Sequence, residues 1–96
     1  MTIETLINKI KDLGLDKYAF LSVGSIGCGD RRISIVENGG AYDVYISNER
    51  GYVDKEGVEL TESRACEMVF SFFEEAKELY EYYEAKGTLE ENGYYS

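Results

Sequence analysis

The chain has 96 residues, a net charge of −9, and no histidine, tryptophan or proline. This length suits one domain, and a hydrophobic content of 44% predicts a folded protein rather than a disordered acidic tail. Without histidine the commonest general base and metal ligand are missing, and the acidity disfavours binding to nucleic acids and anionic membranes, so we expect no enzyme, no metal and no cofactor.

The first predicted element is an amphipathic helix of about three turns. Thr2 can cap its N-terminus, and Gly14 is placed to end it. Its apolar residues repeat at helical spacing: Ile3, Leu6, Ile7, Ile10 and Leu13. The short apolar run that follows predicts a strand from about residue 17 to residue 23.

Residues 24–32, "GSIGCGDRR", invite interpretation as a phosphate-binding loop or a catalytic site. The spacing of Gly24, Gly27 and Gly29 does not match a dinucleotide fingerprint, and no lysine, hydroxyl and following helix complete a P-loop. Cys28 lies near Arg31 and Arg32, but no histidine base is present. We therefore expect a flexible strand connection that carries a basic pair.

Residues 31–53 give the strongest β signal. Ile33 and Ile35 alternate with polar residues, and a second alternating run follows the turn residues at positions 38–40, which predicts a hairpin. Val58 and Leu60 suggest a further short strand. In the segment Glu49-Arg50-Gly51 we expect a turn in which glycine supplies the backbone conformation, with Arg50 also a candidate partner contact.

A long helix is predicted from Thr61 to about Lys86, followed by Gly87. At 100° per residue its sheet-facing side gathers Ala65, Val69, Phe72, Ala76, Tyr80 and Tyr83. The opposite side carries carboxylates, including Glu74, Glu78 and Glu81. Residues 59–96 contain ten acids against three bases, so most of the net charge belongs to this part of the chain.

These elements predict one α+β domain over residues 1–96. It has an N-terminal helix, an antiparallel sheet of three to five short strands, and a long C-terminal helix packed on that sheet. Residues 88–96 are predicted to form a loosely ordered tail. With both helices on one face, the other face should be open and polar, lined by Arg32, Ser34, Tyr45 and Ser47.

The carboxylates and tyrosines of the long helix form the candidate binding surface. A charged helix face is usually only solvated, but here Lys77 and Lys86 are the only lysines that could neutralise it. Tyrosines favoured at interfaces interleave with the acids, which can steer a basic partner. The candidate partner-binding residues are Glu74, Glu78, Glu81, Tyr80, Tyr82, Tyr83 and Arg50.

The runs "AYDVYISNERGYV" and "TESRACEMVFSFFEEAKELY" resemble the small acidic immunity proteins of bacterial polymorphic-toxin and contact-dependent growth inhibition systems. The resemblance covers residues 41–83, and only Glu49, Arg50 and Gly51 map onto it by position. It implies a cytosolic protein that binds the toxic domain of a cognate effector and blocks it. Toxins in those systems are often basic nucleases, which suits an acidic partner.

We therefore expect a non-enzymatic immunity protein that occludes the active site of a toxin. The alternatives are an acidic DNA mimic that inhibits a DNA-binding protein, and a small regulatory or ligand-binding domain. Two unpaired cysteines and an N-terminus without a secretory pattern predict a cytoplasmic location, without membrane or direct nucleic-acid contacts. The oligomeric state stays open.

Overall fold

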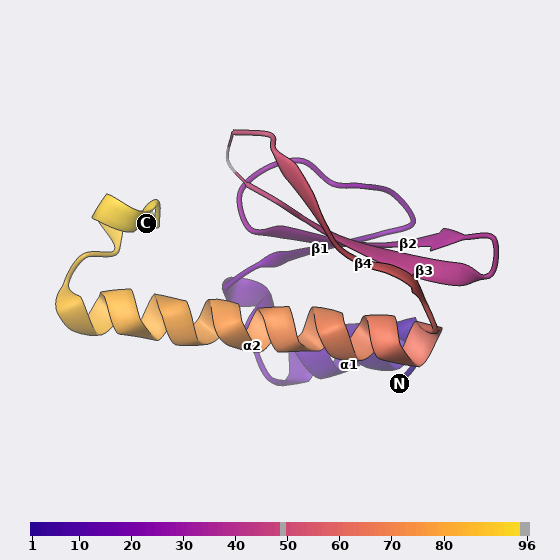
Figure 1. The fold of residues 1–96 in the computed structure, drawn as a ribbon. Coiled ribbons are helices and arrows are strands. Elements are labelled where there is room, and N and C mark those ends of the chain that lie inside the picture. The colour runs from indigo at the N-terminus through magenta and orange to yellow at the C-terminus, as the bar shows by residue number, and fades with distance from the viewer. Residues whose placement is uncertain (49, 95–96) are drawn as a thin grey trace.

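The structure, a computed structural model, describes residues 1–48 and 50–94. Two helices cover one face of a four-stranded sheet, which confirms the α+β class and the order of elements predicted from the sequence (Figure 1). The elements are α1 Ile3–Asp12, the 3-10 turn η1 Leu15–Lys17, β1 Phe20–Val23, β2 Arg32–Asn38, β3 Ala41–Ser47, β4 Val53–Leu60, α2 Glu62–Lys86 and the 3-10 turn η2 Glu90–Asn92.

Both helices start and stop where their end residues favour it. The hydroxyls of Thr2 and Thr61 each accept a hydrogen bond from the backbone N–H three residues later, at 3.2 Å in both helices. Gly14 and Gly87 follow the helices with φ values of 68° and 70°, a left-handed conformation that glycine adopts without steric cost. The predicted helix boundaries are thus confirmed to within a residue or two.

The sheet has the order β1-β2-β3-β4 and is mostly antiparallel. The exception is β1, which runs parallel to β2 with Leu21 opposite Ile33. The sequence prediction of an entirely antiparallel sheet is therefore wrong for this pair. The first strand is also shorter than predicted, because Leu15–Lys17 form a turn of 3-10 helix before it.

The core lies between the sheet and the helices. Leu6 of α1, Ile35 and Val44 of the central strands and Phe73 of α2 are almost completely buried there. Gly57 of β4 admits α2 at close range, since a Cβ at this position would lie 2.9 Å from the sulfur of Met68. Alternation along the central strands sends apolar side chains to the helices and polar ones to the other face.

The connection between β1 and β2 crosses that other face, on the side of the sheet away from α2 (Figure 1). The Gly27 N–H donates a hydrogen bond of 2.9 Å to Ser34 Oγ, and Ser47 Oγ donates one of 2.9 Å to the Gly29 carbonyl. Ser34 and Ser47 are consequently buried, so the predicted open face is wrong for these two residues. Arg32 and Tyr45 on the same face stay partly exposed.

Close packing of this loop leads to a prediction for Gly27. A Cβ there would collide with Ser22 Oγ and lie 2.5 Å from Cγ of Arg32, so we expect Gly27→Ala to lower the free energy of unfolding by about 1–3 kcal/mol. Urea denaturation measures this change. The exposed neighbour Ser25 provides the control, since Ser25→Ala should change stability by less than about 0.5 kcal/mol. Equal stabilities for the two variants would show that the loop does not pack on the sheet.

Candidate functional site

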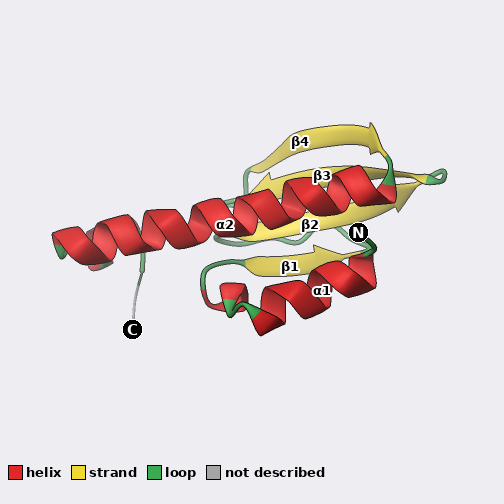
Figure 2. Ribbon diagram, turned by 90° about the horizontal axis from the view of Figure 1, so that it is seen from below, coloured by secondary structure: helices red, strands yellow, loops and turns green. Residues whose placement is uncertain are grey.

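Only the first half of α2 contributes fully buried residues to the core. Its buried residues are Ala65, Cys66, Val69 and Phe73, and none follows Phe73 in this helix. Figures 1 and 2 show the reason. The C-terminal half of α2 continues well past the ends of the strands. We call residues 74–86 of α2 the overhang.

The three predicted glutamates lie together on the overhang. Glu74, Glu78 and Glu81 are all exposed, and all three line one shallow cavity of about 390 Å³ between α2 and the end of α1. The structure thus brings these carboxylates together on one surface, which spans about 10 Å along the helix. Lys77 lies among them, but no ion pair joins it to a carboxylate of the described residues. The acidic charge of the overhang is therefore available to a partner.

Apolar side chains form part of the wall of the same cavity. Leu13, at the end of α1, is 56% exposed and lines the cavity together with Leu15 and Phe70. Leu79 of the overhang is 47% exposed but is not part of this wall. Sequence reasoning missed this contribution because Leu13 belongs to the apolar repeat of the first helix, which predicts a core-facing side chain. Leu13 thus adds an exposed apolar side chain to the acidic surface of the cavity.

Two of the three candidate tyrosines pack within the protein. The Tyr80 ring lies 5.2 Å from the rings of both Tyr18 and Tyr94, and Tyr83 lies 6.1 Å from Tyr94. Tyr80 and Tyr83 are accordingly half-buried, whereas Tyr82 is 55% exposed. Tyr82 is therefore the most exposed of the three, although its ring lies 5.6 Å from that of Tyr83 and the Lys86 ammonium lies 5.1 Å from its ring centre.

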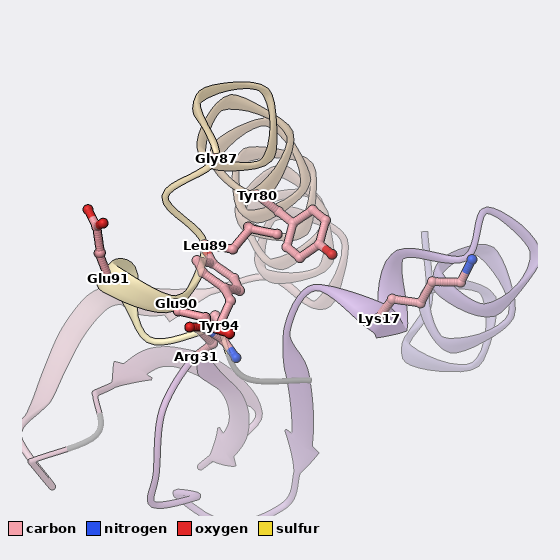
Figure 3. A pocket seen from close by; sticks show the side chains of 8 residues that line it. All are labelled: Lys17, Arg31, Tyr80, Gly87, Leu89, Glu90, Glu91 and Tyr94. Carbon is pink, nitrogen blue, oxygen red and sulfur yellow. The ribbon is translucent and has the colours of Figure 1, made fainter.

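The tyrosine cluster holds residues 88–94 back against the rest of the protein. The Arg31 guanidinium lies over the Tyr94 ring, with its Cζ 4.2 Å from the ring centre. Nη1 of Arg31 also forms an ion pair of 3.1 Å with Oδ2 of Asp30. A cavity of about 560 Å³ opens beside these groups, with Tyr80, Leu89 and Glu90 in its wall (Figure 3). Arg31, one of the two arginines of the glycine-rich loop, thus contacts the C-terminal segment and helps to hold it in place.

Arg50 lies apart from the glutamates. It is exposed in the turn between β3 and β4, which lies on the side of the sheet away from α2 (Figure 1). Asn48 organises this turn, since its Oδ1 accepts hydrogen bonds from the N–H groups of Arg50 and Tyr52. Gly51 has a φ of 83°, which confirms the turn glycine. Glu49, the other residue mapped by the resemblance, lies outside the described residues.

The two cysteines differ in exposure. Cys28 is exposed, while Cys66 is fully buried, and burial together with the nearby Glu62 raises the pKa of the Cys66 thiol. We expect one thiol per native chain to react quickly with a chromogenic disulfide reagent at neutral pH, and both in denaturant. Cys28→Ser should remove the fast phase. Fast reaction of that variant would contradict the burial of Cys66.

Neither a metal site nor a membrane span is found in residues 1–48 and 50–94. No three cysteine, aspartate or glutamate side chains converge there as a metal would require. None of the described helices combines the length and apolar character needed to cross a membrane.

No protein-family model, no curated protein and no solved structure matches the chain. The overhang is therefore the feature from which we infer a function. It is an acidic helix segment on which Leu79 and Tyr82 are also exposed.

Proposed function

We propose that the protein is a cytoplasmic immunity protein, which binds the toxic domain of a cognate bacterial effector and occludes its active site. The observation that carries this proposal is the overhang, where the exposed residues Glu74, Glu78 and Glu81 line one shallow cavity. The resemblance of residues 41–83 to immunity proteins of polymorphic-toxin systems supplies the biological setting. The protein acts by binding and takes no catalytic part.

The shape and charge of the overhang favour a basic nuclease as the target. A nuclease binds its phosphodiester substrate in a concave site lined with positive charge, and such a site complements a projecting acidic helix. Residues 74–86 carry five glutamates and two lysines. The carboxylates would pair with basic groups of the cleft, and Leu13, Leu79 and Tyr82 would supply the apolar contacts that exclude water.

The extent of the acidic surface favours this function over mimicry of a DNA duplex. Glu74 and Glu81 lie seven residues apart, which is about 10 Å along the helix axis. Phosphates follow each other every 3.4 Å of axis on each strand of DNA, so the stripe corresponds to about three steps. It would fill one catalytic cleft, whereas a protein that grips a duplex contacts phosphates over a longer path.

Capture of the partner tests the proposal. The protein carrying an affinity tag at Met1 is cross-linked in the cells that produce it, and the bound protein is identified by mass spectrometry. We expect a basic protein that is toxic when produced alone and harmless when this chain accompanies it. A bound protein without toxicity, or one that competing duplex DNA displaces while its own nuclease activity is absent, would contradict immunity.

A further inference from the structure

A groove runs between α1 and the outer edge of β1. Figure 2 shows α1 beside β1, on the outer side of the sheet edge that β1 forms. The layer of helices therefore extends further on this side than the sheet does. The groove has a volume of about 410 Å³ and a largely apolar wall. Ile7 and Ile10 of α1 form one side, and Leu21 and Val23 of β1 form the other.

The backbone of β1 is unpaired on the side of this groove. Phe20 and Gly24 donate their N–H groups to carbonyls on the β2 side, Arg31 and Ile35. Because backbone groups of successive residues in a strand point to opposite edges, the N–H and C=O groups of Leu21 and Val23 point outward. β1 is an edge strand of the described sheet, and an extended chain could pair with it there.

The other edge of the sheet is protected against such pairing. β4 contains a bulge, with a register shift opposite Val44 and a φ of 51° at Glu59. The Asp43 carboxylate fixes this bulge by accepting a hydrogen bond of 2.9 Å from the Glu59 N–H. Charged side chains also follow one another along β4 at Asp54, Lys55 and Glu56. β1 has neither device, and Phe20 and Val23 are 49% and 46% exposed on it.

The charge around the groove differs from that of the rest of the chain. Residues 9–32 carry five of the ten bases and three of the nineteen acids. Arg32 lines the groove, and its Nε is buried without a hydrogen-bond partner. Its Nη1 has a long contact of 3.4 Å to Ser22 Oγ. Asp16 lines the same groove but forms no ion pair with Arg32, so a carboxylate brought to this position by a partner would pair with a guanidinium that has no acidic partner among the described residues.

We propose that the groove binds an extended segment of a partner protein, which adds to β1 as a fifth strand. Alternate side chains of this segment are apolar and enter the groove over Ile7 and Ile10. The intervening side chains are acidic, and one of them pairs with Arg32. This surface is independent of the overhang, so the proposal does not require that the protein be an immunity protein.

A peptide titration tests the proposal. The probe is a nine-residue peptide of alternating valine and glutamate with blocked ends, added to uniformly ¹⁵N-labelled protein. We expect amide chemical-shift changes in residues 7–11 and 19–24, with a Kd on the order of 100 μM for so short a pairing. Replacing the glutamates of the peptide by lysine should weaken binding about tenfold, and N-methylation of alternate peptide amides should abolish it.

Substitutions in the protein give a second, matched comparison. Arg32→Glu should weaken binding about tenfold, whereas Arg64→Glu, the same charge change at an exposed position on α2, should leave the Kd within about twofold. The peptide variants keep the test decisive if Arg32→Glu fails to fold.

Three outcomes would overturn the proposal. The first is the absence of shifts at about 1 mM peptide. The second is equal binding of the lysine peptide or the N-methylated peptide. The third is the appearance of the same shifts with rising protein concentration alone, which would assign the groove to a second copy of this chain.

Discussion

Simultaneous reversal of Glu74, Glu78 and Glu81 to lysine should weaken binding to the captured partner by at least about 100-fold. The three carboxylates share one cavity, so the variant replaces attraction by repulsion at a single contact surface. Folding should be unaffected, because all three side chains are exposed and none forms an ion pair among the described residues. Calorimetric titration at two salt concentrations measures the effect, and the variant should also lose the salt dependence of the wild type.

A second triple variant separates this local effect from a change in net charge. Glu37, Asp54 and Glu56 are exposed on β2 and β4, and their reversal to lysine changes the charge by the same amount. We expect the Kd of this control to change by less than about fivefold, because long-range attraction is largely screened at physiological salt. Equal losses in the two variants would mean that only the overall charge matters, and the overhang would then have no special role.

Truncation of two leucines to alanine should give sharply different stabilities. Leu6 of α1 is fully buried, and Leu6→Ala should lower the free energy of unfolding by about 3 kcal/mol through lost burial and the cavity left behind. Leu79 on the overhang is 47% exposed, and Leu79→Ala should cost less than about 1 kcal/mol. Urea denaturation measures the free energies of unfolding of both variants. The expected difference between them is a large part of the total stability of a chain of this size.

The two leucine variants also test whether the overhang projects from the rest of the protein. Both residues are leucines within helices, so helix propensity changes equally in the two variants. If Leu79→Ala destabilises the protein as much as Leu6→Ala, the second half of α2 packs against the protein and does not project. A small effect at Leu79 combined with weaker partner binding would place this side chain in the interface.

The helices and the central hairpin could be predicted from local pattern. Helical spacing from Ile3 to Leu13, capping threonines and the alternation in β3 each depend on neighbouring residues only. The parallel pairing of β1 could not be predicted in this way. It depends on where residues 24–31 travel, and hydrogen bonds from Gly27 to Ser34 and from Ser47 to Gly29 fix that path across the sheet. The motif "GSIGCGDRR" therefore has a structural explanation in the fold.

The candidate site, too, could be predicted only in the part that depends on local pattern. The carboxylate stripe follows from a rotation of 100° per residue along one helix, and the structure places Glu74, Glu78 and Glu81 together. That rotation also put Tyr80 and Tyr83 on the inner side of the helix, but it could not supply their partners. Tyr18 and Tyr94 come from distant parts of the chain, so only the tertiary structure shows that Tyr82 is the most exposed of the three candidate tyrosines.

Protection of growing cells tests the central claim most directly. Cells that produce the captured partner under an inducible promoter are supplied with the wild-type chain, the Glu74, Glu78 and Glu81 triple reversal, or the Glu37, Asp54 and Glu56 control. The proposal predicts that the wild type and the control restore growth while the first triple variant, at equal cellular abundance, does not. Full protection by that variant would contradict recognition through the overhang, and no protection by the wild-type chain would contradict immunity itself.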